Sequence, residues 1–235
     1  MFDDVLGDWP TYDRLILTSC DEVYFNKYFP RFYNTFTQHW QLPIHVHVID
    51  PSEKSLGRLH KLGISHTFCK TNKELLKWPY SYETYCQAQR FIILGNKASD
   101  TQSVIVADVD AYALRSPSQS QKDILFGDMA FTTFNTRLMA TFCHFHPRRR
   151  QEALQSAEMM KDIILNVDTI GVDQQVLKKV FSQLPYNELN HREWISHLDV
   201  KTPTQKKLHE ACLVYHEKGT RGKIKPVGTT WTDIE

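Results

Sequence analysis

Residues 103–110 read Ser-Val-Ile-Val-Ala-Asp-Val-Asp, a short apolar run that stops at two carboxylates. The run Ser103–Ala107 has the length and the β-branched content of a buried strand. Asp108 and Asp110 follow at its carboxyl end. Because side chains alternate along an extended chain, the two carboxylates should point to the same side. The stretch therefore predicts a strand of a parallel sheet, with an acidic pair at the edge where such sheets bind ligands.

Strands and helices alternate on both sides of this strand. The patterns predict strands at 14–19, 44–49, 129–134 and 211–215. They also predict one helix that begins near residue 21 and three further helices at 83–94, 147–165 and 172–181. Pro30 should kink or divide the first helix, and Gly95–Asn96 should end the second. Such alternation is typical of an α/β fold, in which helices flank a mostly parallel central sheet.

The composition excludes some classes of protein. The formal net charge of +1 lacks the basic excess typical of nucleic-acid-binding proteins, so we expect no nucleic-acid partner. No run of residues is apolar for long enough to predict a transmembrane segment. The five cysteines are widely spaced and form no Cys-x-x-Cys pair, which favours reduced thiols and a cytoplasmic location.

The acidic pair predicts a metal site. Two neighbouring carboxylates repel each other, and a divalent cation relieves the repulsion. His216, far along the chain, offers a third ligand of a type that suits manganese. We therefore predict that Asp108, Asp110 and His216 bind one Mn²⁺ or Mg²⁺ ion. The alternative is an ordinary turn at a strand end, where Asp-x-Asp is also common.

The residues after His216 read Glu-Lys-Gly-Thr-Arg-Gly-Lys and combine glycine with positive charge. Gly219 would let the backbone approach phosphate oxygens, and Lys223 would neutralise their charge with help from Lys218 or Arg221. The alternative is a solvated basic segment with an unrelated histidine. Together with the acidic pair, this segment describes a clamp for a metal-bound diphosphate.

Several segments resemble, in order and in rough spacing, the GT-A-fold glycosyltransferases of family 8, the family of glycogenin and the bacterial lipopolysaccharide galactosyltransferases. The matching segments are Thr-Ser-Cys-Asp-Glu-Val-Tyr at 18–24, Asp-Val-Asp at 108–110, Phe-Asn-Thr-Arg-Leu-Met at 134–139, Asp-Gln-Gln-Val-Leu at 173–177, and His-Glu-Lys-Gly at 216–219 with Lys223 beyond. Two positions depart from the family pattern, since Arg137 replaces a glycine and Gln175 replaces an acid.

The resemblance implies roles for individual residues. The donor would be bound by Thr18, Ser19, Asp21, Tyr24, Arg90, Asp108, Gly219 and Lys223. The residues on the catalytic side, beside the transferred sugar or the acceptor hydroxyl, would be Asp173, Asn135 and Gln174. Ordinary alternatives remain open, because Asp21 and Asp173 stand where helix N-caps are expected and Arg90 could be a surface cation.

The resemblance also implies a fold and an activity. It predicts one GT-A domain over 1–235, with a nucleotide-binding part at about 12–110 and an acceptor and metal-loop part at about 111–235. The activity would be metal-dependent transfer of a hexose, with retention, from a nucleotide-sugar donor such as a UDP-hexose to an unidentified acceptor. Two other functions remain open: a nucleotide-sugar-binding protein without transfer, and a haloacid-dehalogenase-like phosphatase that uses Asp108.

Overall fold

An eight-stranded sheet forms the centre of the computed structural model, which describes residues 2, 4–77, 79–134, 137–190, 193–196, 211–216 and 230–234. In spatial order its strands are β1 (Leu6–Gly7), β4 (Ser65–Cys69), β3 (Ile44–Ile49), β2 (Arg14–Asp21), β5 (Ser103–Ala107), β8 (Arg137–Phe145), β7 (Ala130–Phe134) and β9 (Asn187–Asn190). The four strands β4, β3, β2 and β5 run parallel to one another, whereas β8 is antiparallel to both β5 and β7.

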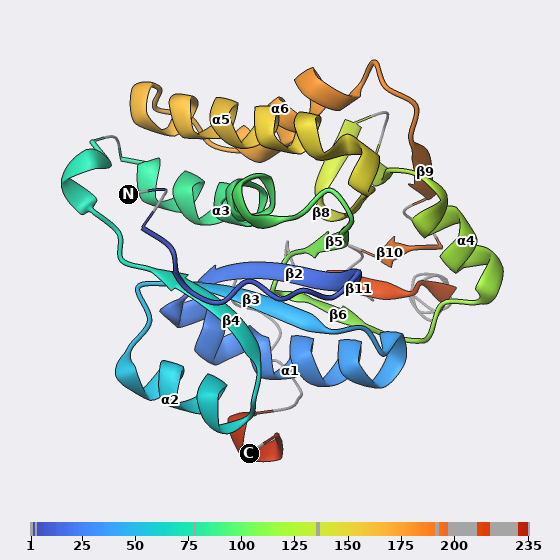
Figure 1. Ribbon diagram of the computed structural model, residues 1–235, viewed down its shortest axis with the longest axis horizontal. Coiled ribbons are helices and arrows are strands. Elements are labelled where there is room, and N and C mark those ends of the chain that lie inside the picture. The colour runs from blue at the N-terminus through green and yellow to red at the C-terminus, as the bar shows by residue number, and fades with distance from the viewer. Residues whose placement is uncertain are drawn as a thin grey trace, which may run out of the picture.

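Helices cover both faces of this sheet (Figure 1). On one face lie α3 (Ser81–Lys97), α5 (Arg150–Asn166) and α6 (Val172–Phe181), and on the other lie α1 (Glu22–Trp40) and α2 (Glu53–Lys61), while α4 (Gln119–Gly127) contacts β7 and β9. Alternation along β5 sends Val104 and Val106 into the first core and Ile105 and Ala107 into the second. The apolar run 103–107 is therefore buried on both faces, as expected of a central parallel strand.

A second, smaller sheet joins distant parts of the chain. It has the order β10 (Ile195–Ser196), β11 (Val214–His216) and β6 (Ala111–Ala113) within the described residues. The strand β6 begins immediately after the acidic pair, and β11 pairs with it in antiparallel register so that His216 lies opposite Ala111. This pairing joins the acidic pair to the histidine across the small sheet.

The predicted α/β fold class is confirmed, and several elements have the predicted bounds. Of the two predicted effects of Pro30, a kink or a division of the first helix, the division does not occur, because α1 is one α-helix from Glu22 to Trp40. Its phenylalanines Phe25 and Phe29 and their neighbours on the same helix face are fully buried against the sheet, and this packing outweighs the lost backbone hydrogen bond.

None of the helices in the described part of the chain is long and apolar enough to cross a bilayer.

The second helix ends close to the predicted Gly95–Asn96, since α3 runs to Lys97. Gly95 lies inside its last turn and allows α3 and α5 to pack closely. A Cβ atom at this position would lie 2.4 Å from the Cβ of Ala157 and 2.8 Å from the carbonyl oxygen of Ala153. The glycine therefore serves packing between two helices.

We expect Gly95→Ala to lower the free energy of unfolding by about 1–3 kcal/mol, because the added methyl group must displace backbone atoms of α5. Chemical denaturation measures this change. The matched control is Gly57→Ala in α2, where nothing lies within 4 Å of the new Cβ and alanine favours the helix by up to about 1 kcal/mol. Equal stability of the two variants would contradict the packing role of Gly95.

Buried histidines make the fold sensitive to acid. Nδ1 of His144 lies 2.9 Å from the carbonyl oxygen of Asp128, and its Nε2 lies 2.6 Å from Oγ of Ser103. Since a carbonyl only accepts, Nδ1 donates and Nε2 accepts, which makes the ring neutral. Burial lowers the pKa of His144 to about 4, and burial lowers the pKa of His45 and of His47 to about 3.

Because these folded-state pKa values lie below the usual 6.5 of histidine, the unfolded chain takes up protons as the pH falls below 6.5 while the folded chain does not. The contribution of these neutral histidines to the free energy of unfolding is therefore fully present above pH 6.5. It falls toward pH 4 by about 1.4 kcal/mol per pH unit for each such histidine. We expect His144→Gln to reduce this slope by one histidine's share in urea unfolding between pH 4.5 and 6.5. The exposed His60→Gln on α2 is the control and should keep the full slope; equal slopes for both variants would refute the assignment.

Candidate active site

The acidic pair lies in a turn at the carboxyl end of β5. The backbone N–H of Ala111 donates to the carbonyl oxygen of Asp108 at 3.0 Å, so the chain bends between β5 and β6 and does not stay extended. The two carboxylates nevertheless face one point, because the turn and the short strand β6 hold both against β11. The predicted convergence is correct, and the turn produces it.

His216 completes this group. Its Nε2 lies 3.0 Å from Oδ2 of Asp108 and 3.0 Å from Oδ1 of Asp110. The imidazole is buried, and burial alone would lower its pKa; the hydrogen bonds to the two carboxylates outweigh burial and raise the pKa to about 9. The ring therefore carries a positive charge that offsets part of the negative charge of the acids.

These three side chains fit a divalent cation. One ligand atom from each side chain lies within 4.8 Å of the other two. Among the described residues, no second group of three potential metal ligands lies this close together. Two ligand atoms at right angles around an ion with bonds of about 2.1 Å lie about 3.0 Å apart, close to the observed spacing. Two carboxylates and one imidazole, which would lose its proton when it binds the ion, are a suitable donor set for Mn²⁺ or Mg²⁺.

Arg90 lies behind the acidic pair and is not a surface cation. Its Nη2 lies 2.7 Å from Oδ1 of Asp108 and 3.0 Å from Oδ2 of Asp173, and all three side chains are largely buried. Burial would lower the pKa of Arg90, but the two carboxylates outweigh it and raise the pKa. One oxygen of Asp108 is thus held by Arg90, while the other faces His216 and Asp110.

Asp173 also differs from its expected capping role. Gly171 precedes α6 as the N-cap residue with a left-handed backbone, and Asp173 lies within the first turn of the helix. Its Oδ1 accepts a hydrogen bond from the backbone N–H of Gln174 at 2.8 Å, and its Oδ2 binds Arg90. Arg90 therefore links Asp173 to Asp108, and Gln174 contributes its backbone N–H to Asp173.

On the donor side, Asp21 caps α1, since its Oδ1 accepts from the backbone N–H of Tyr24 at 2.8 Å. The ring of Tyr24 is half exposed, and burial together with the charge of nearby Asp110 raises the pKa of its phenol. Thr18 and Ser19 have buried hydroxyls without a hydrogen-bond partner in the described structure. Alternation along β2 directs these two side chains to opposite faces of the sheet, so they cannot both contact one ligand directly.

Two residues near Asp21 were missed by sequence reasoning. Burial and the charges of Cys86, Asp21 and Asp50 raise the pKa of Tyr82, which places its phenol beside two acids at the carboxyl edge. Asp50 directly follows β3 with a φ of 52°, and its Oδ1 accepts from the backbone N–H of Thr71 at 2.7 Å. The position of an acid just after a buried strand was the available signal.

Other predicted site residues lie outside the described residues. These are Asn135, Gly219 and Lys223, together with the assisting Lys218 and Arg221. The two departures from the family pattern are described in part: Arg137 contributes its backbone to β8, and Gln175 is exposed and donates to the carbonyl oxygen of Ile170 at 3.1 Å.

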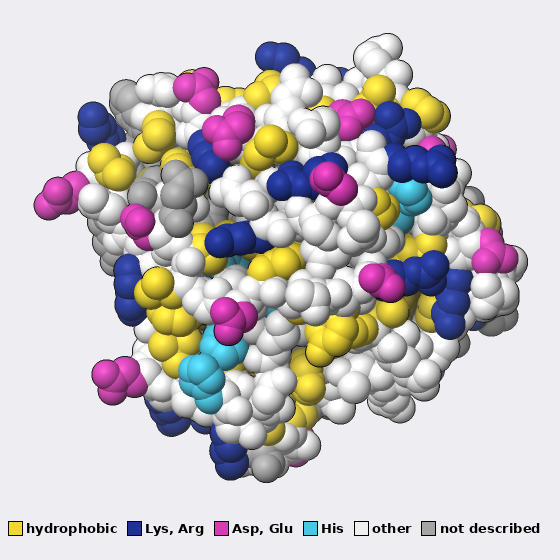
Figure 2. All heavy atoms as spheres, in the orientation of Figure 1, with side chains coloured by type: hydrophobic (Ala, Val, Ile, Leu, Met, Phe, Trp, Pro, Cys, Tyr) yellow, Lys and Arg dark blue, Asp and Glu magenta, His cyan; other side chains and the backbone are white. Residues whose placement is uncertain are grey.

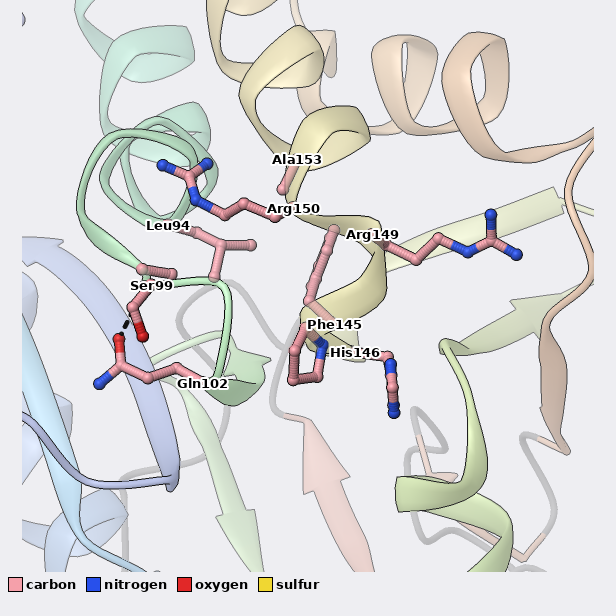
Figure 3. Close-up of a pocket in the computed structure, with 10 residues that line it drawn as sticks. Leu94, Ser99, Gln102, Phe145, His146, Arg149, Arg150 and Ala153 are labelled. Carbon is pink, nitrogen blue, oxygen red and sulfur yellow. Dashed lines mark hydrogen bonds between the residues drawn. The ribbon is translucent and has the colours of Figure 1, made fainter.

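A small cavity lies elsewhere, and the side chains of Arg149 and Arg150 extend from its edge in opposite directions (Figure 3). It is lined by Leu94, Ala98, Ser99, Gln102, Phe145, His146, Pro147, Arg149, Arg150 and Ala153. These residues surround the loop that enters β5 and the end of β8, at the opposite end of β5 from the acidic pair. Arg149 forms an ion pair with Glu152 at 3.3 Å. None of Asp108, Asp110 and His216 lines the cavity, which is therefore separate from the candidate metal site.

Comparison with known proteins identifies the fold. No protein-family model and no curated protein matches the chain. Among solved structures, the chain is similar to the galactosyltransferase LgtC in complex with donor and acceptor sugar analogs, with a TM-score of 0.59, 14% identity and 87% of each chain covered. An active-site mutant of LgtC matches with a TM-score of 0.56, 14% identity and the same coverage. The chain therefore has the GT-A fold.

We expect Mn²⁺ to raise the melting temperature of this protein, because an ion bound only by the folded state stabilises it by about 2.7 kcal/mol at a hundredfold excess over the dissociation constant. His216→Ala and Asp110→Asn should abolish the shift. Asp123→Asn on α4 is the matched control and should retain it. A Mn²⁺ shift that persists in His216→Ala would exclude the three-residue metal site.

Proposed function

We propose that this protein is a metal-dependent glycosyltransferase that moves a hexose from a nucleoside-diphosphate sugar, such as a UDP-hexose, to an acceptor hydroxyl. The observation that carries the proposal is the convergence of Asp108, Asp110 and His216. Ligand atoms from two segments far apart in the sequence lie within 4.8 Å of one another. An ordinary strand-end turn gives no reason for a buried imidazole to face both acids.

The fold supports the same conclusion. Ligands of open α/β sheets bind outside the carboxyl ends of the strands, and Asp21, Asp50 and Asp108 all stand at such ends. The similar solved structure is named a galactosyltransferase and holds donor and acceptor sugar analogs. A metal-binding carboxylate pair in this position is suited to a sugar linked to a diphosphate.

The reaction breaks the bond between the anomeric carbon and the diphosphate oxygen and forms a bond between that carbon and the acceptor oxygen. The nucleoside diphosphate leaves with the bonding electron pair, and the acceptor hydroxyl loses a proton. A bound divalent cation would neutralise charge on the departing diphosphate. Asp108, Asp110 and His216 would hold that ion, and Lys223 and Gly219 would contact the phosphates.

Arg90 connects the two halves of the proposed site. By binding one oxygen of Asp108, it leaves the other oxygen directed to the proposed ion. By binding Asp173, it fixes the start of α6, where Asp173 and Gln174 would bond hydroxyls of the sugar or of the acceptor together with Asn135. Arg90 would thereby set the distance between donor and acceptor sides. Asp21 and Tyr24 would contribute to nucleoside binding, together with one of the two hydroxyls of Thr18 and Ser19.

The phosphatase alternative is disfavoured by the surroundings of Asp108. Arg90 binds Oδ1 of Asp108 at 2.7 Å, and Oδ2 faces His216 at 3.0 Å and would bind the proposed ion, so neither oxygen would remain to attack a phosphate. A nucleotide-sugar-binding protein without transfer is separated from a transferase by turnover alone.

All five cysteines are free, in keeping with the proposed cytoplasmic location.

We expect one member of a nucleotide-sugar panel, assayed with Mn²⁺ by release of nucleoside diphosphate, to be turned over. Asp110→Asn and His216→Ala should each lower the rate by about 100-fold or more, because the charge of the leaving diphosphate is then poorly neutralised. A chelator should stop the reaction, and Asp123→Asn should leave it unchanged. Tight binding of the nucleoside diphosphate without turnover would instead identify a binding protein.

A further inference from the structure

One arginine of α1 is stacked on the small sheet that carries His216. Cationic side chains are normally solvated, and Figure 2 shows many of them spread over one face of the molecule. Arg31 is instead partly buried, and the central carbon of its guanidinium lies 3.4 Å from the centre of the Tyr112 ring. A planar guanidinium at this distance is attracted to the ring face both as a cation and by stacking. The contact therefore holds α1 to β6, and Figure 1 shows these two elements side by side.

A second contact joins the same two elements one helical turn further along α1. In the described part of the chain, β6 is an edge strand of the order β10-β11-β6, so the outward N–H groups of its backbone face no further strand. The N–H of Ala113 donates to Oγ1 of Thr35 at 3.1 Å, and Thr35 lies four residues after Arg31 on α1. Arg31 and Thr35 thus hold two successive residues of β6.

The ring packing continues from β6 to β11. Tyr215 lies opposite Tyr112 in the antiparallel register, and the centres of the two rings are 5.1 Å apart. Tyr215 is only 5% exposed, so its ring is almost wholly covered. Arg31, Tyr112 and Tyr215 therefore form one continuous group, which we call the arginine–tyrosine stack.

The arginine–tyrosine stack holds both halves of the candidate metal site. Tyr112 follows Asp110 by two residues, and Tyr215 directly precedes His216. The strands β6 and β11 have three residues each, and β-structure this short is marginally stable without further packing. A shift of one strand along the other would carry His216 away from the acids, to which its Nε2 is now 3.0 Å away. The site therefore requires this register, and the stack stabilises it.

We propose that Arg31 is a positioning residue for the metal site: through the arginine–tyrosine stack it holds β6 and β11 in the register that brings His216 to the acidic pair. The inference rests on the proposed function, because it gives Arg31 a role in assembling that same site. If the ligands meet in only a fraction of the molecules, the dissociation constant of the ion rises by the inverse of that fraction. Loss of the stack should therefore weaken metal binding and leave the reaction at saturating metal unchanged.

The test measures the dissociation constant of Mn²⁺ by titration calorimetry. We expect Arg31→Met to raise this constant by about tenfold or more, as is typical when a residue that orients metal ligands is lost. Arg31→Lys should raise it less, because an ammonium group keeps a charge over the ring without the planar stack. Tyr112→Ala should act like Arg31→Met, and the double variant should bind no more weakly than Tyr112→Ala alone, because the two residues act as one unit.

Arg14→Met is the matched control. The guanidinium of Arg14 lies 4.6 Å from the centre of the Phe126 ring, at the amino end of β2 and away from the acids. This variant loses the same kind of contact and should keep the wild-type affinity for Mn²⁺. Circular dichroism shows whether each variant is folded; if Arg31→Met is not, Arg31→Gln replaces it with the same expected result.

Turnover gives a second measurement. Arg31→Met should need about tenfold more Mn²⁺ for half of its maximal rate and should reach the wild-type rate at saturating Mn²⁺. A lower maximal rate with an unchanged Mn²⁺ requirement would refute the positioning role.

The outcomes separate this inference from the proposed function. Wild-type Mn²⁺ affinity in Arg31→Met, equal weakening by Arg14→Met, or full additivity with Tyr112→Ala would each overturn the inference and leave the transferase proposal intact. Absence of Mn²⁺ binding by the wild-type protein would overturn both. The expected changes in Mn²⁺ affinity without turnover of any nucleotide sugar would support the role of Arg31 and overturn the proposed function.

Discussion

Repulsion among three carboxylates at one edge of the sheet is the constraint on which the site depends. Asp108, Asp110 and Asp173 are all partly or fully buried and meet around two cationic groups, Arg90 and the protonated His216. In a poorly hydrated environment such acids are stable only when each is paired. The pairing leaves one net negative charge among these five side chains. A divalent cation bound by Nε2 of His216 would displace its proton, because a ligating imidazole is neutral, and would then balance two net negative charges.

The architecture brings these charges together from four elements. The central strand β5 delivers the acidic pair, α3 delivers Arg90, α6 delivers Asp173 and β11 delivers His216. Close packing of α3 on α5 through Gly95, and of α6 beside them, fixes Arg90 against Asp173. The small sheet fixes His216 against the acids by backbone hydrogen bonds to β6. Each charged group of the candidate site is therefore positioned by a helix, a strand or the turn between β5 and β6.

Two regions adjoin the charged centre. Tyr24 and Asp21 stand on one side, on the strand β2 and the helix that follows it. On the other side, the loop that leads into α6 is held to the start of α3, because Tyr80 and Thr84 donate hydrogen bonds to Asp168 and Thr169. The ion pair of Arg90 with Asp173 joins the same two helices closer to the acids.

The sequence by itself determined the α/β fold class, the buried strand 103–107 and the acidic pair after it, because alternation, apolar runs and strand-end acids are local patterns. It also indicated His216 as a third ligand. It could not determine that Gly95 lets α3 pack closely on α5, or that Arg90 is buried between Asp108 and Asp173. These features depend on contacts between segments far apart in the chain. Only the tertiary structure decides them, because the pairing of β6 with β11 and the packing of α3 against α5 and α6 set distances that no local pattern encodes.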